Sequence, residues 1–251
     1  MRHCYVLRVF TRNGEGGNHL GVVTDVTGID DEQMQTTAAQ LGFSETVFVD
    51  WREGPVPVAR IFTPTTEIPF AGHPLVGAGW VLNVLGPGAD RIRCGIGEIP
   101  IHVDGDRTWI SVPGTRPVRL TTPPGGGVGA FEVLMPLPYM VVAYPDPEAV
   151  AGLDPDGFTS ETLAWSWIRE GEKVKARFFA PSVGVREDPG TGSAAVALAE
   201  VLRRVGMESG SLTIEQGDET GRPCTLHLMW NRDAIRVGGA VVRDEVRVLE
   251  V

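Results

Sequence analysis

The sequence predicts an α+β fold with two similar halves, each a curved sheet around one principal helix. The first observation is a repeat, because residues 60–85 and 177–202 align without a gap at an offset of 117. Each copy reads as an apolar strand, a loop with proline, a tight polar turn and a helix of small residues. The second observation is the content of 32 glycines and 19 prolines, which implies many turns and favours strands. The identical aligned pairs include Arg60 and Arg177, Phe62 and Phe179, Pro64 and Pro181, Ala78 and Ala195, and Leu85 and Leu202.

The elements follow in order from the pattern of apolar residues. Strands are predicted at 5–10, 20–25, 45–51, 57–62, 177–181, 212–214, 225–230 and 234–242, with two or three more in 91–113 and further strand material in 133–144. Helices are predicted at 30–41, from Pro74 to about Leu85, within 154–168, and over 191–206. Residues 121–129 are the best linker candidate because Pro and Gly dominate them. The halves are expected to cover residues 1–117 and 118–251, with terminal strands that can cross over.

Charge and cysteine usage exclude several classes of protein. The formal net charge of −10 argues against nucleic acid or an anionic membrane as a partner, since both require basic patches. The three scattered cysteines show no CxxC spacing, which argues against a disulfide framework and a zinc site. No apolar run approaches the roughly 20 residues that span a bilayer, and the N-terminus is unlike a signal peptide. We therefore expect a cytoplasmic protein.

Two turns carry the residues best suited to chemistry. If the halves face each other, the cleft between them meets two helix N-termini, which bind anions. In the first turn, Gly72 lets backbone approach a ligand and His73 can carry a proton near neutral pH, although a structural histidine is the alternative. Glu45 begins an apolar strand; it is either a partly buried general base or a solvated residue at a strand start.

The second turn differs in chemistry from the first. Asp188 precedes Gly190 and Gly192, whose N–H groups can face a bound anion, while Thr191 and Ser193 can cap the helix start. The plain alternative is an Asp-Pro turn followed by an N-cap. Residues 215–217 read as a turn between strands. No cysteine falls at either turn, so a two-thiol racemase mechanism lacks its nucleophiles.

These motifs follow one another in the order seen in the phenazine-biosynthesis isomerase (PhzF-like) family, which the chain resembles over nearly its whole length. The motifs are GGN near the start, GFSETVFV, RIFTPTTEIPFAGHP, EDPGTGSA and EQGxxxGRP. The sequence departs from the family at His19, Gly190 and Cys224, where Pro, Val and Ser are usual. The resemblance implies a diaminopimelate-epimerase-like fold: two pseudo-symmetric halves, each a curved, mostly antiparallel sheet wrapped around a central helix.

The resemblance also implies a function. It points to a cofactor-independent isomerase, without a metal, that moves a proton on a small carboxylated substrate; homodimers are common among its members. Glu45 matches the base, and His73 and Asp188 match residues that assist proton return. The implied substrate-binding residues are Asn18, Gly72, Gly190, Thr191, Gly192 and Ser193. Two alternatives stay open: a cofactor-free amino-acid epimerase or racemase, and a non-catalytic small-acid binding protein on the same scaffold.

Overall fold

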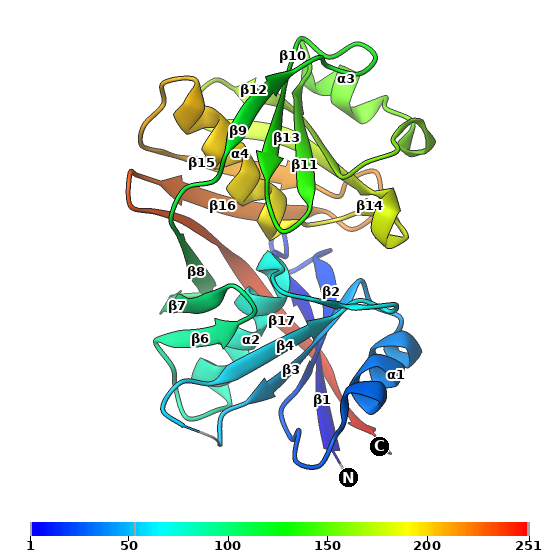
Figure 1. Cartoon of the computed structure of the whole chain (residues 1–251), viewed down its shortest axis with the longest axis vertical. Coiled ribbons are helices and arrows are strands. Elements are labelled where there is room, and N and C mark those ends of the chain that lie inside the picture. Colours follow the sequence, from blue (N-terminus) through cyan, green and yellow to red (C-terminus); the bar gives the residue numbers. More distant parts are fainter. Residues whose placement is uncertain (1, 53, 250–251) are drawn as a thin grey trace.

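A computed structural model describes residues 2–52 and 54–249 of the chain and shows two lobes (Figure 1). The strands of the first lobe are β1 (Arg2–Val9), β2 (Asn18–Val23), β3 (Glu45–Asp50), β4 (Val58–Phe62), β5 (Glu67–Ile68), β6 (Arg91–Cys94), β7 (Gly97–Asp104) and β8 (Arg107–Pro113). The remaining strands are β9 (Val118–Thr121), β10 (Gly129–Leu134), β11 (Pro138–Ala143), β12 (Thr162–Arg169), β13 (Lys173–Ala180), β14 (Val185–Asp188), β15 (Gly210–Gln216), β16 (Cys224–Trp230) and β17 (Ala234–Leu249). The helices are α1 (Asp31–Leu41), α2 (Gly72–Val84), α3 (Pro147–Ala151) and α4 (Gly192–Arg204), with short 3₁₀ turns η1 (Pro155–Gly157) and η2 (Pro181–Val183).

The strand pairings of the first lobe recur in the second. Strands β2 and β3 pair in parallel, as do β11 and β12, and the parallel pair β4–β6 recurs as β13–β15. The antiparallel pairs β3–β4, β6–β7 and β4–β5 likewise recur as β12–β13, β15–β16 and β13–β14. The chain therefore builds the same mixed α+β arrangement of strands twice.

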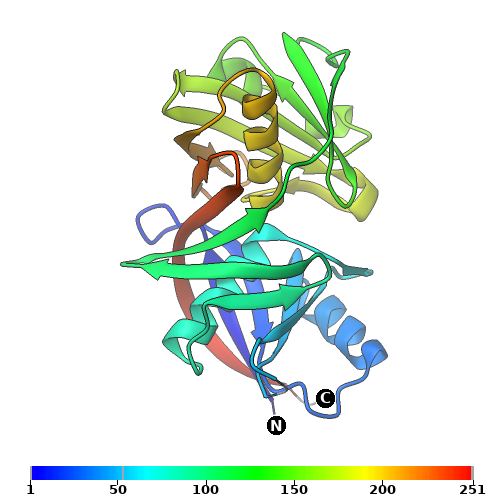
Figure 2. The ribbon, with the colours of Figure 1, turned by 60° about the vertical axis from the view of Figure 1, so that its left-hand side comes forward.

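Strand β17 joins the two lobes. The first part of β17 pairs with β16 and β8, and its last residues pair with β1, where Arg2 lies opposite Leu249. In the other direction, the chain enters the second lobe just before β9, which pairs there with β10. Figure 2 shows β17 running from one lobe to the other, with both ends of the chain at the far end of the first lobe.

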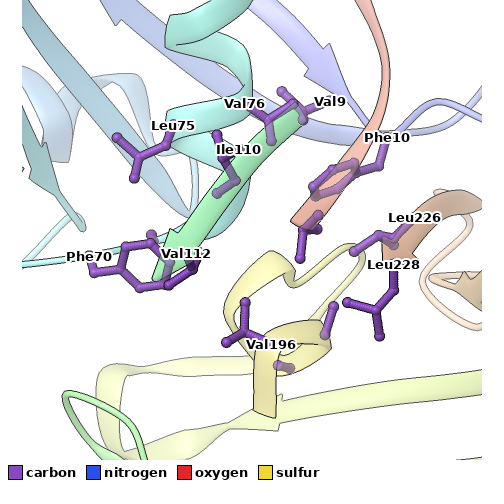
Figure 3. Packing of buried hydrophobic residues seen from close by; sticks show 14 of the residues in the cluster. Val9, Phe10, Phe70, Leu75, Val76, Ile110, Val112, Val196, Leu226 and Leu228 are labelled. Atoms are coloured by element: carbon purple, nitrogen blue, oxygen red, sulfur yellow. The ribbon is translucent and has the colours of Figure 1, made fainter. Parts of the chain in front are cut away.

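Each lobe holds one nearly buried helix against its strands. Helix α2 packs against strands β1 to β4, β6 to β8 and β17, and α4 packs against β9, β10, β11, β16 and β17. Small residues allow this close packing, because every residue of α4 from Gly192 to Leu202 is buried. At the junction, the side chains of both lobes form one hydrophobic core in which Phe10 lies beside Leu226, and Phe70 beside Val112 (Figure 3).

The remaining helices lie on the outside, and local sequence explains their ends. Helix α1 begins at a capping box formed by Asp30 and Gln33 and ends at Gly42, whose φ of 68° suits glycine. Its predicted range of 30–41 is confirmed. The short helix predicted within 154–168 is present only as the single 3₁₀ turn η1. Helix α3 lies before this range, and the end of the range forms strand β12.

The predicted linker at 121–129 is also wrong. Residues 122–128 connect β9 and β10, which pair with each other within the second lobe. The chain passes between the lobes earlier, in the segment 114–117 that joins β8 to β9. The Pro and Gly residues of 122–128 therefore mark the loop between two paired strands rather than a boundary between the lobes.

The repeat is present in the structure, but the residue offset between its two copies changes from the strands to the helices. Arg60 and Arg177 stack over Phe62 and Phe179 respectively, as the offset of 117 predicts. Helices α2 and α4, however, begin at Gly72 and Gly192, which are 120 residues apart. The loop after Phe179 is three residues longer than the loop after Phe62 and contains η2. The identities at Ala78/Ala195 and Leu85/Leu202 are therefore not structurally equivalent.

Candidate active site

The two central helices begin directly against each other. A Cβ atom on Gly72 would lie 2.6 Å from the Cα of Gly192 and 2.9 Å from the backbone nitrogen of Ser193. A Cβ on Gly192 would in turn lie 2.9 Å from the Cα of Gly72. Only glycine allows the two backbones to come this close. The two predicted turns therefore lie against each other and bring both helix N-termini to one place.

The N-termini of these two helices are not capped by side chains. In the described residues, no side chain accepts a capping hydrogen bond at α2 or α4, and neither helix has an acidic residue in its first turn. Helices α1 and α3 do have such caps, from Asp30 and Asp146. The first N–H groups of α2 and α4 therefore keep the partial positive charge that suits a carboxylate.

Asn18 connects the two lobes at this point. Its Nδ2 donates to Oδ1 of Asp188 at 2.8 Å and to the carbonyl of Gly190 at 3.1 Å. The Ser44 hydroxyl donates to Oδ1 of Asn18 at 3.2 Å, and Nδ1 of His73 lies 3.4 Å from Asn18 Nδ2. One amide thus positions the acidic residue of the second turn relative to the first lobe.

Asp188 is a buried carboxyl group at the end of β14. The hydroxyl of Thr191 donates to Oδ2 of Asp188. Nε2 of Gln216 donates to the backbone carbonyl of Asp188 at 2.8 Å and to Oγ1 of Thr191 at 3.1 Å. Burial raises the pKa of Asp188, and the nearby Glu45 carboxyl raises it further, against the hydrogen bonds from Thr191 and Asn18. Asp188 therefore holds a proton more readily than an ordinary aspartate.

Glu45 lies at the start of β3, with its side chain 17% exposed. Its Oε2 is buried, has no hydrogen-bond partner in the described residues, and lies 3.5 Å from Nε2 of His73. Burial raises the pKa of Glu45 to about 7, although a hydrogen bond with Ser44 opposes the rise. A carboxyl with this pKa is able to take up or release a proton near neutral pH.

His73 lies behind Glu45 and is almost completely buried. Burial lowers the pKa of His73 to about 4, even though the Asp188 carboxyl opposes this effect. The imidazole is therefore neutral at pH 7. In this state it orients its neighbours and is a poor proton donor.

A cavity of about 400 Å³ lies between the lobes and is lined by residues from both turns. Glu45 and Ala71 line it from the first lobe, and Asp188, Thr191 and Ser193 line it from the second. The rest of the wall is largely apolar and includes Phe70, Leu137, Phe178, Val183 and Val185. The other predicted residues lie behind the wall: Asn18, Gly72, His73, Gly190 and Gly192.

Sequence reasoning missed two residues that belong to this arrangement. The Tyr139 hydroxyl lies 3.1 Å from Oγ of Ser193 and lines the cavity, and burial raises the pKa of Tyr139 to about 12. No local pattern distinguishes this tyrosine from the rest of its strand. Gln216 lies in the EQG motif, which we interpreted as a turn; in fact Gln216 ends β15 and holds Asp188 and Thr191 together.

None of the three cysteines lines the cavity. Cys4, Cys94 and Cys224 are free and buried, and burial raises the pKa of Cys224 well above its usual range. Among residues 2–52 and 54–249, no three His, Cys, Asp or Glu side chains group as metal ligands. No helix in the same residues is long and apolar enough to cross a membrane.

Comparison with known proteins agrees with this fold. The model of the phenazine biosynthesis-like protein family (PhzC-PhzF) matches residues 7–121 and 138–245. An uncharacterized isomerase of Pasteurella multocida is 31% identical, with 95% of this chain and 90% of the relative covered. The trans-2,3-dihydro-3-hydroxyanthranilate isomerase of Pseudomonas chlororaphis is 31% identical, with 90% of this chain and 89% of that protein covered.

Solved structures share the architecture at lower identity. A putative phenazine biosynthesis PhzC/PhzF protein from Clostridium difficile superposes with a TM-score of 0.79 at 17% identity, covering 100% of both chains. A hydroxyproline epimerase from Agrobacterium vitis has a TM-score of 0.66 at 10% identity, covering 98% of this chain and 91% of that one. The fold is thus one that PhzC/PhzF proteins share with a hydroxyproline epimerase. The chain belongs to the PhzC-PhzF family and is an isomerase.

Proposed function

We propose that this protein moves a proton between two carbons of a small carboxylated substrate, without a cofactor, in the cavity between its lobes. The observation that carries the proposal is that two carboxyl groups with raised pKa, Glu45 and Asp188, line one cavity from opposite lobes. Groups whose pKa values are shifted towards neutrality by burial are typical of acid–base catalysis.

In this proposal Glu45 is the general base. Its carboxylate removes a proton from a carbon beside an unsaturated or carbonyl system, because its Oε2 has no other partner in the described residues. A pKa of about 7 leaves a large fraction of Glu45 ionised at neutral pH while keeping it basic. General base catalysis of this kind contributes about 10²–10⁴ in rate.

Asp188 is the group that returns a proton. Its raised pKa favours the protonated form, and Asn18 and Thr191 fix the orientation of its two oxygens. His73 is neutral and serves as a positioning residue between Glu45 and Asn18. This assigns proton return to Asp188 and leaves His73 without a transfer step.

The substrate carboxylate binds where the two helices begin. The uncapped N–H groups of the first turns of α2 and α4 carry partial positive charge, and Ala71 and Ser193 bring this region to the cavity wall. Such fixed donors also stabilise negative charge that develops as the proton leaves; each contributes about 3–4 kcal/mol in known cases.

An epimerase acting at a single carbon is the second candidate, favoured by the same pair of carboxyls facing one cavity from two lobes. It removes and returns the proton on opposite faces of one stereocentre. The third alternative, a binding protein without turnover, is set aside because the chain belongs to a family of isomerases.

The test locates deuterium in the product. The protein is incubated in D₂O with a panel of small unsaturated carboxylates that begins with trans-2,3-dihydro-3-hydroxyanthranilate, the substrate named for the Pseudomonas chlororaphis relative. Deuterium at a carbon other than the one that lost hydrogen, read by NMR, supports the proposal. Exchange confined to one stereocentre supports the epimerase instead, and the absence of exchange with every ligand that binds contradicts both.

A further inference from the structure

A second cavity of about 400 Å³ lies within the second lobe, at the end of α4 that is remote from the candidate active site. Its wall includes Phe131 on β10, Trp165 and Trp167 on β12, and Val201 and Val205 at the end of α4. Helix α4 has 13 residues, so at about 1.5 Å per residue its two ends lie about 18 Å apart. The second cavity shares no lining residue with the cavity between the lobes, and the proposed reaction does not account for it.

In the first lobe, a side chain covers the corresponding place. Gly86 and Gly206 follow α2 and α4 at the same offset of 120 as the helix starts. A Cβ on Gly86 would lie 3.3 Å from the Trp51 ring, whereas a Cβ on Gly206 would have no described atom beyond its own chain neighbours within 4 Å. Trp51 and Trp167 are counterparts, since each stands five residues after the threonine of the Ser-Glu-Thr triplet at the start of β3 or β12. The second lobe therefore leaves a space open at its helix end that the first lobe fills with an indole ring.

The two tryptophans of the second cavity form a right-angled aromatic wall. Trp165 and Trp167 are two residues apart on β12, so their side chains leave the strand on the same face. Their rings meet edge to face, with centroids 5.2 Å apart and planes at 86°. In the first lobe Val49 stands in the place of Trp165, opposite Ala59 as Trp165 is opposite Ala176. A ligand in the second cavity thus meets two indole rings of different orientation, and the faces of such rings attract cations.

The formal charge in this wall is negative. Among the described residues that line the second cavity, the one charged side chain is that of Glu170, which is exposed to solvent in the turn between β12 and β13. The cations beside it in sequence have other partners, because Arg169 pairs with Glu172 at 2.7 Å and Lys173 pairs with Glu215 at 2.6 Å. The wall therefore offers aromatic rings and one carboxylate to a ligand, and no positive charge.

We propose that the second cavity binds a small organic cation, in which an alkylated ammonium group is carried on an apolar frame. The apolar frame fills the space beside α4, the ammonium group lies against the rings of Trp165 and Trp167, and Glu170 balances its charge. Alkyl groups on the nitrogen suit this wall, because they leave fewer N–H groups that need acceptors and the wall supplies few. A volume of about 400 Å³ lies in the range of small-molecule sites. This binding site is independent of the proposed reaction.

The test compares a cation with a neutral molecule of the same shape. Phenyltrimethylammonium and tert-butylbenzene are each titrated with the full-length protein, and dissociation constants are measured by ligand-observed NMR. The wild type is expected to bind the cation at least about 5-fold more tightly than tert-butylbenzene.

Two variants locate the site of that preference. In Glu170→Gln and in Trp167→Leu the preference is expected to fall below about 2-fold, while tert-butylbenzene still binds the apolar part of the wall. Glu132→Gln is the matched control, because Glu132 is an exposed glutamate of the same lobe that does not line the second cavity; its preference is expected to equal that of the wild type.

Three results would overturn the proposal. A wild-type protein that binds tert-butylbenzene as tightly as the cation has an unselective apolar cavity, and one that binds neither compound has no ligand site of this kind; neither comparison requires a variant to fold. A preference that survives in either variant, once circular dichroism shows that the variant is folded, places the cation elsewhere on the protein, such as in the cavity between the lobes.

Discussion

The burial of Glu45 predicts a pH-dependent effect on stability that is measurable without a substrate. The pKa of this carboxyl rises from 4.5 to about 7 on folding, mainly because burial disfavours its charged form. At about 1.4 kcal/mol per pKa unit, ionised Glu45 costs the folded protein about 3 kcal/mol. Glu45→Gln has a similar shape but cannot ionise, so it avoids this cost.

The sign follows from proton linkage. Below pH 4.5 the carboxyl is protonated in both the folded and the unfolded chain, so the wild type keeps its full stability. Between pH 4.5 and about 7 the folded protein binds more protons than the unfolded chain, so stability falls as pH rises. Above pH 7 the loss is complete. Glu45→Gln is therefore expected to gain on the wild type by about 3 kcal/mol between pH 4 and pH 8.

Urea unfolding of both proteins at several pH values directly measures this difference in the free energy of unfolding. Glu132→Gln on β10 is the matched control, because Glu132 is exposed and its carboxyl stays in water. A gap between Glu45→Gln and the wild type that stays constant from pH 4 to pH 8 would refute the reasoning from burial.

Three further predictions concern activity and packing. If Glu45 is the base, kcat/KM rises tenfold per pH unit below about 7 and levels off above it, and a profile flat from pH 5.5 to 8 contradicts this assignment. A variant with Cys4, Cys94 and Cys224 all replaced by Ala keeps its turnover, because these thiols are buried and none of them lines the cavity between the lobes; loss of activity by a folded triple variant would show otherwise. Gly190→Ala places a Cβ 2.8 Å from Sγ of Cys224 and is expected to cost about 1–3 kcal/mol of stability. Adding Cys224→Ala restores most of that loss in a thermal unfolding assay, and equal melting temperatures for the single and double variants would contradict this contact.

The repeated fold was predictable because each copy has a strong strand, a proline loop and a helix of small residues. The residue-by-residue correspondence between helices α2 and α4 was not predictable. An alignment without gaps places Ala78 opposite Ala195 because helices rich in Ala and Gly match at many offsets. The close approach of Gly72 to Gly192 shows the register of 120 instead. Strand β12 was not predicted, because a short apolar run fits a buried strand as well as a helix.

The residues of the candidate site could be predicted from the sequence, but the hydrogen bonds that join them could not. Glu45 and Asp188 stand in recognisable motifs at a strand start and a turn. The hydrogen bond from Asn18 to Asp188 joins residues 170 positions apart, and no local pattern predicts such a contact.

The exchange of substrate hydrogen with solvent tests the central claim most directly. Wild type, Glu45→Gln and Asp188→Asn are compared in D₂O with one ligand that each protein binds, and the initial rate of deuterium incorporation is measured by NMR. Removal of the base is expected to lower the rate by at least about 10² with little change in affinity, whereas Asp188→Asn retains exchange at the carbon that Glu45 deprotonates. Equal exchange rates in Glu45→Gln and the wild type would remove Glu45 from the mechanism and contradict the account.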